Sequence, residues 1–492
     1  MFNATVLLLT GWALSLLAAS QGMMVLFALA YGETDALRIF LLAGLITFFC
    51  AGSLIAGFRG RQERVGRADT AILILLVWLG LPIFAAVPFH LLSAVPDGAS
   101  AYFEAVSGLT TTGASVIEKL DEVPRTIIMW RAVLHGIGGA LSLLTAVLLL
   151  APFDTAMSPV KSTVPGYEEG DLPKSVLATS RDILPIYLAF ILFAFAGLWL
   201  VNLPAFDAMV YALSAASTGG FSANDGGIAL YNSPVAEAIL CVAMLAGATS
   251  FLAHRADLVR LPSGGHRDVY ESQTMLIIAV VAAAVLSVII LFEPATSIDE
   301  PLGILEAMRY GTFRAISLIT TTGLDNAPVT AAPAPFVLVL ALIFIGGAAF
   351  STASGIKIFR VSMLMAQAHR ELKRLVYPRA VTRAHAAGKT FTIQTLKPVW
   401  ALLFVFLLGS SLIALIISSQ GESFETSMVA AIAALSNAGP AMGIALGEGG
   451  SLHSYATMNG FSKITLSLGM VLGRLEFLAI LGLAGWWWHN RV

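Results

Sequence analysis

Charge is scarce in this sequence. Only 12% of its 492 residues are Asp, Glu, Lys or Arg, whereas 57% are hydrophobic. Soluble domains carry roughly a quarter charged residues, so this composition excludes an ordinary soluble protein and is typical of an integral membrane protein. The formal net charge of −2 leaves no basic surplus to neutralise phosphates, which argues against a nucleic-acid partner.

Reactive groups are scarce as well. The two cysteines, Cys50 and Cys241, each lie in an apolar run without a CxxC pattern or a nearby histidine, so we expect both to be packing residues. No GxxxxGK[ST] motif occurs, which argues against ATP hydrolysis by this chain. We find no nucleophile-base constellation and no metal cluster, so we expect no enzymatic activity and no organic cofactor. A membrane enzyme acting on lipid is a distant alternative.

Long hydrophobic runs, by contrast, are abundant. About ten are close to the roughly 20 residues that cross a bilayer as a helix. The first lacks a basic n-region and is too long for the apolar core of a signal peptide, so we expect a retained span. The runs are Thr5–Tyr31, Ala36–Phe58, Thr70–Phe89, Thr126–Leu150, Ile183–Leu203, Pro234–Ala253, Thr274–Phe292, Pro335–Lys357, Val399–Ser418 and Ser462–Trp488.

Four polar tips lie between pairs of these runs. Each follows a half-apolar stretch that is too short to span but long enough for a re-entrant half-helix. Their glycines, at positions 113, 219, 323 and 439, recur at intervals of 106, 104 and 116 residues. The near-constant period predicts four copies of one unit. The tips are Thr111-Thr112-Gly113, Ser217-Thr218-Gly219, Thr321-Thr322-Gly323 and Asn437-Ala438-Gly439.

We therefore predict an all-α polytopic membrane protein with four pseudo-repeats. Each repeat is a span, a re-entrant pore loop and a span, and the four surround one pore, with two extra N-terminal transmembrane helices. The expected divisions are 1–68 for the two-span extension, 69–152 for repeat 1, 153–182 for a cytoplasmic loop, 183–256 for repeat 2, 270–360 for repeat 3, 361–395 for a basic cytoplasmic segment and 396–492 for repeat 4.

The tips are candidate cation ligands. Backbone carbonyls from four loops can replace the water around a bare cation, and the C-terminal end of each half-helix carries partial negative charge. No tip has a charged side chain, which favours a weakly hydrated monovalent ion over Ca²⁺. Because the tips differ in sequence, we expect an asymmetric filter with one consistent glycine per repeat.

Charge also predicts the orientation. Basic residues cluster on the connections away from the tips, and acidic residues cluster on the tip side, so the positive-inside rule places the tips outside. The basic set is Arg59, Arg61, Arg64, Arg67, Arg255, Arg260, Arg267, Arg360, Arg370, Lys373, Arg374, Arg379, Arg383 and Lys389. The acidic set includes Glu33, Glu118, Asp121, Asp225 and Glu422.

Two further stretches are unusual for membrane spans. Residues 346–357 place Gly346, Gly347, Ser351, Thr352, Gly355 and Lys357 within the last span of repeat 3. They predict either close packing through small residues or a broken helix in the permeation path. Lys357 is then either a snorkelling end residue or a cation in the path. Arg474 and Glu476 each cost about 2.5–3.5 kcal/mol at membrane depth, so they either face the pore or form a packing ion pair.

Several of these motifs together resemble the Trk/Ktr/HKT superfamily of potassium transporters, most closely the bacterial TrkH type. The resemblance covers nearly the whole chain, including the two extra N-terminal spans. It depends on Ser107 to Ser115, Met129-Trp130-Arg131, Phe206-Asp207-Ala208, Ser217 to Ser222, Ile319 to Gly323, Asn437 to Pro440 and Leu472 to Glu476.

The resemblance implies potassium uptake across the bacterial inner membrane, with K⁺ bound at the tip residues. It also implies a homodimer embedded in membrane lipid and a cytosolic nucleotide-binding regulatory ring of TrkA type. The broken helix of repeat 3 would be a gate, with Arg474 beneath the filter. Glycine at all four tips resembles the potassium-selective branch.

The chain departs from the family pattern at Ala441, Phe350, Ser354 and Ser250, which bear on gating more than on ion identity. A sodium- or proton-coupled symporter remains the alternative to a channel. A buried acidic residue in the pathway would favour coupling, and Glu476 is the candidate that the sequence offers.

Overall fold

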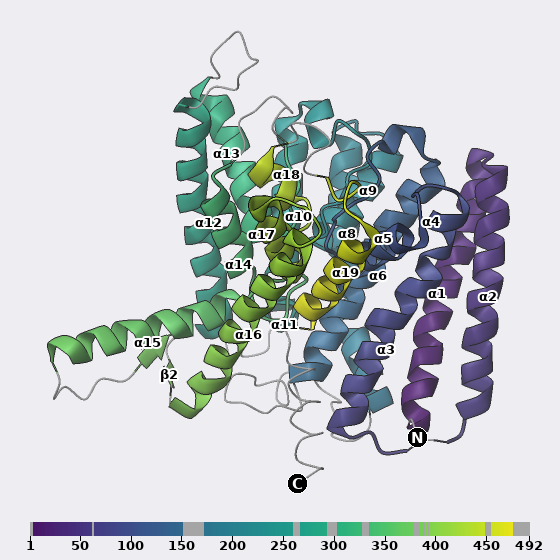
Figure 1. Cartoon of the computed structure of the whole chain (residues 1–492), viewed down its shortest axis with the longest axis horizontal. Coiled ribbons are helices and arrows are strands. Elements are labelled where there is room, and N and C mark those ends of the chain that lie inside the picture. Colours follow the sequence, from purple (N-terminus) through teal and green to yellow (C-terminus); the bar gives the residue numbers. More distant parts are fainter. Residues whose placement is uncertain are drawn as a thin grey trace.

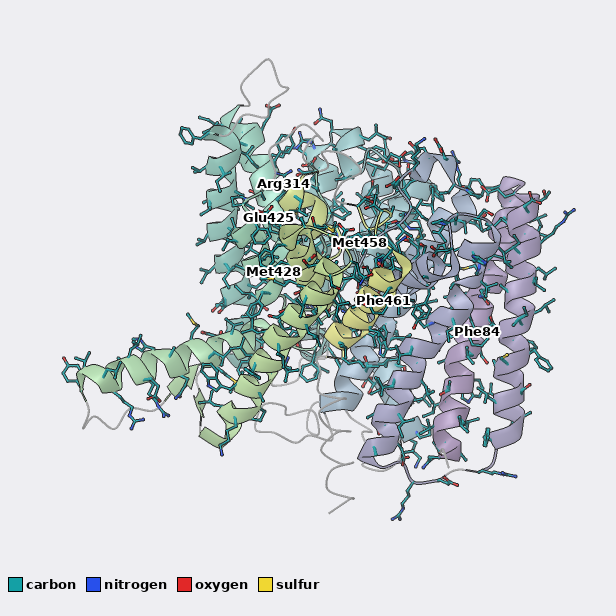
Figure 2. All side chains as sticks on the ribbon, in the orientation of Figure 1. Phe84, Arg314, Glu425, Met428, Met458 and Phe461 are labelled. Carbon is teal, nitrogen blue, oxygen red and sulfur yellow. The ribbon has the colours of Figure 1, made fainter. Side chains whose placement is uncertain are left out.

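The computed structural model describes residues 3–61, 63–150, 172–258, 266–292, 303–326, 334–377, 384–386, 389–391, 393–447 and 454–475. These residues form one helical bundle (Figure 1), and side chains fill the space between the helices (Figure 2). The only strands in the described residues are β1 (Ala384–Ala386) and β2 (Lys389–Phe391), which pair antiparallel. The all-α expectation is otherwise confirmed.

The N-terminal extension is a helical hairpin at one edge of the bundle (Figure 1). Helices α1 (Ala4–Tyr31) and α2 (Thr34–Phe58) are joined at Gly32, whose φ of 72° ends α1 in the left-handed conformation that glycine adopts without strain. The outer face of α2 exposes large apolar side chains, with Phe48 66% and Phe49 73% exposed. Such a face is compatible with lipid and not with water.

The remaining helices are grouped into four sets in chain order, each containing both long and short helices. The first set is α3 (Arg67–Ala85), α4 (Val87–Leu91), α5 (Gly98–Leu109) and α6 (Arg125–Leu150), and the second is α8 (Leu172–Leu200), α9 (Ala205–Ala216), α10 (Pro234–Ala248) and α11 (Phe251–Leu258). The third is α12 (His266–Phe292), α13 (Ile304–Ile319), α14 (Phe336–Ile345) and α15 (Ile358–Val376), and the fourth is α16 (Ile393–Ser418), α17 (Phe424–Leu435), α18 (Ala441–Leu446) and α19 (Gly460–Arg474).

Seven helices among the described residues are long and apolar enough to cross a membrane. They match seven of the expected spans. Two further expectations, Pro234–Ala253 and Pro335–Lys357, are wrong as single long helices. Thr249 is extended and ends α10, and α14 stops at Ile345. Helix α19 ends at Arg474, and the rest of the run to Trp488, with Glu476, lies outside the described residues. The loop predicted to end at residue 182 is also too long, because α8 begins at Leu172.

Three glycines make the same contact in three of the four sets. Gly138 of α6, Gly247 of α10 and Gly473 of α19 each lie against a backbone carbonyl, and a Cβ at any of them would overlap it. The carbonyls belong to Leu109, Ala216 and Leu435, the last residues of α5, α9 and α17. Small residues allow such close helix approach in membrane proteins. The short helices α5, α9 and α17 are therefore held at their C-terminal ends.

We expect Gly138→Ala to lower stability by about 1–3 kcal/mol, because the added methyl meets backbone that cannot rotate away. The measurement is the temperature at which detergent-solubilised protein loses its monodisperse elution. Gly52→Ala in α2 is the control, since a Cβ there meets nothing within 4 Å. Equal midpoints for the two variants would contradict the close-packing assignment.

Candidate functional site

Four short helices end in the same strained turn. After α5, α9, α13 and α17, a hydroxyl residue caps the helix and the next residue has positive φ. The values are 52° at Thr111, 54° at Thr218, 57° at Thr321 and 48° at Asn437. Left-handed backbone is rare for a β-branched residue, and such strain persists only where the surroundings over-determine it.

Hydrogen bonds fix each turn on its own helix. The amide after each left-handed residue donates to a carbonyl near the helix end, at 2.8 to 2.9 Å. The pairs are Thr112 to Ser107, Gly219 to Ser214, Thr322 to Ser317 and Ala438 to Ala433. The four short helices therefore present matching turns, defined here as turn 1 (111–113), turn 2 (218–220), turn 3 (321–323) and turn 4 (437–439).

This alignment corrects one residue of the predicted register. Gly220, not Gly219, occupies the position of Gly113 and Gly323, with φ values of 86°, 75° and 80°. Ser217 is the helix cap that corresponds to Thr110 and Thr320. Gly219 and Gly220 are adjacent in the sequence, and the spacing between tips does not show which of them is equivalent to Gly113.

The four turns meet in a closed ring. The amide of Gly439 in turn 4 donates to the carbonyl of Thr112 in turn 1 at 2.6 Å, and Asn437 Nδ2 donates to Thr112 Oγ1 at 2.9 Å. Gly113 lies against the carbonyl of Gly219 in turn 2. Turn 2 meets turn 3 through the contact of Gly220 with the Thr322 carbonyl. Turn 3 closes the ring through the contact of Gly323 with Pro440, the residue directly after turn 4.

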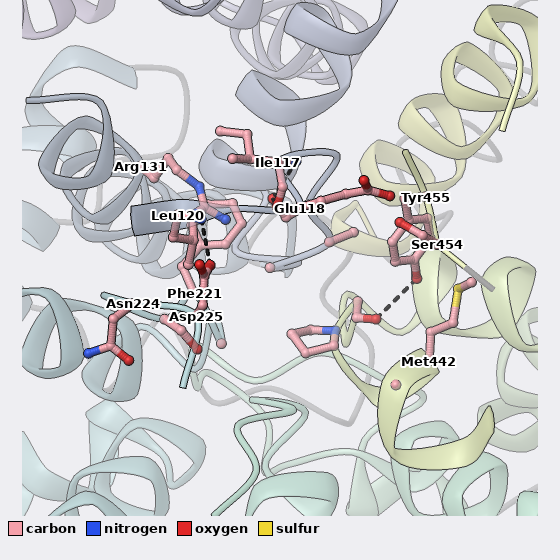
Figure 3. A pocket seen from close by; sticks show the side chains of 18 of the residues that line it. Ile117, Glu118, Leu120, Arg131, Phe221, Asn224, Asp225, Met442, Ser454 and Tyr455 are labelled. Carbon is pink, nitrogen blue, oxygen red and sulfur yellow. Dashed lines mark hydrogen bonds between the residues drawn. The ribbon is translucent and has the colours of Figure 1, made fainter. Parts of the chain in front are cut away.

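A cavity of about 420 Å³ opens on one side of the ring. Gly113, Gly220 and Gly439 line it. Glu118 and Asp225 contribute acidic groups to the lining (Figure 3). The hydroxyl of Tyr455 donates to the carbonyl of Gly439 at 3.1 Å. Polar and acidic groups thus lie beside the glycines of three turns.

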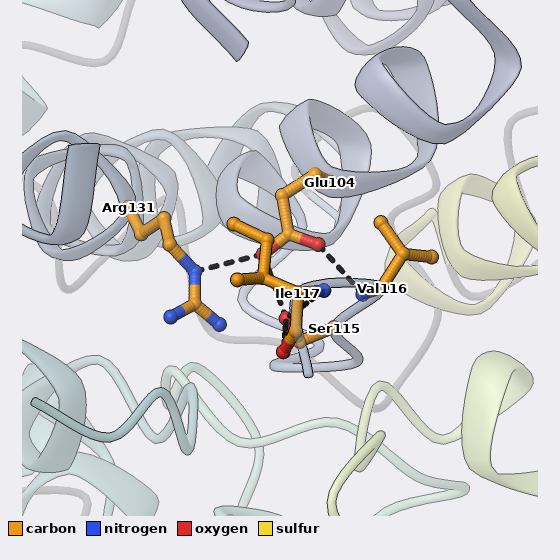
Figure 4. A network of polar contacts seen from close by, with 5 residues as sticks. All are labelled: Glu104, Ser115, Val116, Ile117 and Arg131. Atoms are coloured by element: carbon orange, nitrogen blue, oxygen red, sulfur yellow. Dashed lines mark hydrogen bonds and ion pairs between the residues drawn. The ribbon is translucent and has the colours of Figure 1, made fainter. Parts of the chain in front are cut away.

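A buried ion pair supports turn 1, and sequence reasoning missed it. Glu104 Oε1 accepts from Arg131 Nε at 2.7 Å, and both side chains are almost fully buried (Figure 4). The guanidinium lies 4.0 Å from the ring centre of Phe221, and His135 stacks on the same ring at 4.1 Å. His135 is therefore a packing side chain against turn 2. Glu104 belongs to no recognisable sequence motif. Its place beside turn 1 and Arg131 is therefore visible only in the folded chain.

The break in the third set is a compact loop, residues 346–357, called here the intrahelical loop. Gly346 and Gly355 have φ values of 70° and 83°, and a Cβ on Gly346 would overlap the carbonyl of Ser354. Its end returns to α14, since Ile356 N donates to the Phe344 carbonyl at 2.9 Å. The broken-helix interpretation is therefore confirmed for the backbone. Phe350 also has positive φ, 57°, where a glycine would be unstrained.

The intrahelical loop reaches two of the turns. Ser354 N donates to Thr321 Oγ1 at 3.0 Å, and Thr218 Oγ1 lies 3.3 Å from Thr352 Oγ1. Thr352 N also donates to the Gly247 carbonyl at 3.0 Å. Ser351 Oγ and Lys357 Nζ both bond to carbonyls of the loop itself, those of Ala348 and Ala353. Lys357 is 6% exposed, so it does not snorkel to an interface.

Arg474 joins this loop to α19. Its Nη1 donates to the Thr352 carbonyl and to Ser354 Oγ, both at 2.7 Å, and its Nε donates to Ser142 Oγ of α6. The structure thus brings together Arg474, the intrahelical loop and turns 2 and 3. Glu271 of α12, which the sequence did not single out, is fully buried and accepts from the amide of Ala349 at 2.7 Å.

Comparison with known proteins agrees with this arrangement. The family model of TrkH, described as a cation transport protein, matches residues 39–484. This chain belongs to the TrkH family. Being a TrkH-family chain with several membrane-spanning helices, it is an integral membrane protein.

Similar proteins cover nearly all of the TrkH-family chain. The Trk system potassium uptake protein TrkH of Vibrio parahaemolyticus is 28% identical over 482 residues, 97% of each chain. TrkH of Salmonella typhimurium is 28% identical over 448 residues, covering 88% of this chain and 89% of that one. TrkG of Escherichia coli is 28% identical over 471 residues, 94% of each. A crystal structure of the potassium transporter TrkH from Vibrio parahaemolyticus superposes with a TM-score of 0.84 at 27% identity, covering 98% of both chains.

Proposed function

We propose that this chain takes up K⁺ across the bacterial inner membrane, through the ring of four turns. The observation that carries the proposal is the closure of that ring, in which each turn contacts the next at a glycine. The relatives named as potassium uptake proteins support the choice of ion. Flux would run down the electrochemical gradient, because the sequence has no ATP-hydrolysing motif.

Helix orientation supports a cation as the transported ion. The C-terminal ends of α5, α9, α13 and α17 all point into the turns, and a helix C-terminus carries roughly half a negative charge. Rings of carbonyl oxygens can substitute for the hydration shell of K⁺. The proposed filter comprises the residues predicted from the sequence, Thr111, Thr112, Gly113, Ser217, Thr218, Gly219, Thr321, Thr322, Gly323, Asn437, Ala438 and Gly439, together with Gly220.

The intrahelical loop is the proposed gate. It bonds to turns 2 and 3 on their helix side, whereas the acidic cavity lies beside the glycines. A loop in this place would obstruct an ion leaving the ring, and Arg474 would add a repelling charge. The proposed gate residues are Gly346, Gly347, Ser351, Thr352, Gly355, Lys357 and Arg474.

Partners follow from the family and from charge. We infer a homodimer in membrane lipid, and a cytosolic nucleotide-binding regulator of TrkA type. Helix α15 follows the proposed gate directly, projects sideways from the bundle (Figure 1) and exposes Lys373 and Arg374. It is the surface that we assign to the regulator.

Substitution of a turn glycine should change ion selectivity. Gly113→Ser adds a Cβ that overlaps the Gly219 carbonyl at a residue with φ of 75°, so turns 1 and 2 must separate. We expect the K⁺/Na⁺ permeability ratio in liposomes to fall by roughly tenfold. Gly32→Ser is the matched control, because Gly32 also has positive φ, 72°, but no neighbour within 4 Å. An unchanged ratio in Gly113→Ser would remove turn 1 from the filter.

Removal of Arg474 tests the gate. A charge a few ångström from a path of effective dielectric near 20 opposes a cation by a few kcal/mol, so Arg474→Ala should raise K⁺ flux per folded protein by on the order of tenfold. Ser142→Ala is the control, since it removes one hydrogen-bond partner and keeps the charge. A fall in flux for Arg474→Ala would show that the arginine is a scaffold and not a barrier.

Charge reversal on α15 tests the regulatory surface. Arg370→Glu, Lys373→Glu and Arg374→Glu together should weaken co-purification of the regulator by tenfold or more, roughly the effect of several lost charge contacts. The control reverses Arg59, Arg61 and Arg64, which are exposed on the connection between α2 and α3. If both triple variants retain the regulator equally, α15 is not its docking surface.

A coupled symporter is the second candidate, and Glu271 is the observation that favours it. This carboxylate is buried against the intrahelical loop and accepts from the amide of Ala349, and acidic residues at membrane depth often belong to ion or proton pathways. Coupling to protons would shift the reversal potential when a pH gradient is imposed on liposomes, and Glu271→Gln would abolish the shift. A reversal potential that follows only the K⁺ gradient identifies a channel.

A further inference from the structure

One position on the short helices recurs beside the ring. It lies nine residues before the turn glycines Gly113, Gly220, Gly323 and Gly439. The residues there are Glu104, Tyr211, Arg314 and Ala430, all at most 4% exposed. The four side chains are acidic, phenolic, basic and apolar. Sequence comparison among the repeats therefore does not reveal a common role.

In the first set, Glu104 holds the chain that follows turn 1. Its Oε2 accepts from the amide of Val116 at 2.9 Å, and its Oε1 accepts from Ser115 Oγ at 3.1 Å (Figure 4). Val116 and Ser115 come three and two residues after Gly113. Arg131 of α6 also donates a hydrogen bond to the Glu104 carboxylate. The short helix is thus tied to both sides of its own turn.

In the third set, the same tie is made with the charges reversed. Arg314 Nε donates to Asp325 Oδ1 at 2.9 Å, and its Nη2 donates to Oδ2 at 2.7 Å. Asp325 comes two residues after Gly323, so the tie again joins the short helix to the chain beyond the turn. Arg314 lies on α13 in the upper part of Figure 2. Glu237 of α10 holds the next residue, Asn326, through Oε2 at 2.8 Å.

The other two sets lack this tie. Tyr211 is fully buried, and its hydroxyl makes no hydrogen bond within the described residues. Ala430 has no side chain to make a tie. There the chain beyond turn 4 is helix α18, and the Gly439 carbonyl accepts from Met442 N at 3.2 Å and from Tyr455 Oη at 3.1 Å.

We propose that this position is a strut that fixes the backbone beyond turns 1 and 3, and that Glu104 and Arg314 are thereby positioning residues for ion selectivity. The inference rests on the proposed function, and it concerns residues that contact no ion. Left-handed threonines persist only under strong restraint, and the strut restrains the far side of the turn. A buried pair is costly to break and so holds one geometry.

The competing explanation is that these ion pairs only stabilise the fold. Stability and selectivity therefore have to be measured on the same protein. The test variants are Glu104→Gln, which keeps an acceptor for Val116 but removes the charge facing Arg131, and Asp325→Asn, which weakens the Arg314 pair. Asp182→Asn is the control, because Asp182 pairs with Arg255 between α8 and α11, away from the turns.

Each variant is purified by size exclusion, reconstituted, and assayed for its K⁺/Na⁺ permeability ratio from reversal potentials. We expect the ratio to fall on the order of threefold to tenfold in Glu104→Gln and Asp325→Asn, the effect of about one lost hydrogen bond. Asp182→Asn should keep the wild-type ratio. If Glu104→Gln does not fold, Asp325→Asn decides, because its carboxylate is partly exposed.

Wild-type ratios in both folded variants, alongside a lowered ratio in Gly113→Ser, would overturn the strut and leave the filter in place. A wild-type ratio in Gly113→Ser as well would instead overturn the filter, and the strut with it. A lowered ratio in Asp182→Asn equal to that of the test variants would show that any lost ion pair has this effect, and would also overturn the strut.

Discussion

Close backbone contact at the ring is the constraint on which the rest of the structure depends. Turns 1 and 2 each place a glycine where a Cβ would overlap the next turn, turn 3 places Gly323 against Pro440 directly after turn 4, and turn 4 places Gly439 against Ala114. Four backbones can approach this closely only if their helices are held at fixed angles and depths. The glycines of α6, α10 and α19 provide that hold at three of the short helices, because each lets a long helix lie directly on a terminal carbonyl.

The same constraint explains where the polar groups are. Strained turns need restraint from several directions, and an apolar bundle provides few groups for it. Buried polar residues therefore gather around the turns, with Glu104 and Arg131 on one side and Arg474 with the intrahelical loop on the other. Unpaired, such groups would be costly in a low-dielectric interior, and paired they hold one geometry.

Much of this architecture was predictable from the sequence. Hydrophobic run length identified seven long helices, and the period of the tips identified four matching turns. Small residues at 346–357 indicated either close packing or a helix break, and the structure shows the break. The register at Gly219 and Gly220 was not predictable, because either glycine satisfies the count and only φ and hydrogen bonding separate them. Glu104, Glu271 and Arg314 were missed for another reason. Each contacts residues brought close by the fold, and neither hydropathy nor spacing records such contacts.

All four quarters of the ring are encoded in one chain, which has a consequence for how the ring can change. In an assembly of four identical subunits, every mutation is copied to all quarters at once. Here the equivalent positions already hold three residue types, Thr112 and Thr322 against Gly219 and Ala438, and turn 4 bonds to its neighbour through an asparagine side chain. The sequence of each quarter can therefore change independently. A single inherited substitution alters one edge of the ring, while the other three edges preserve its geometry.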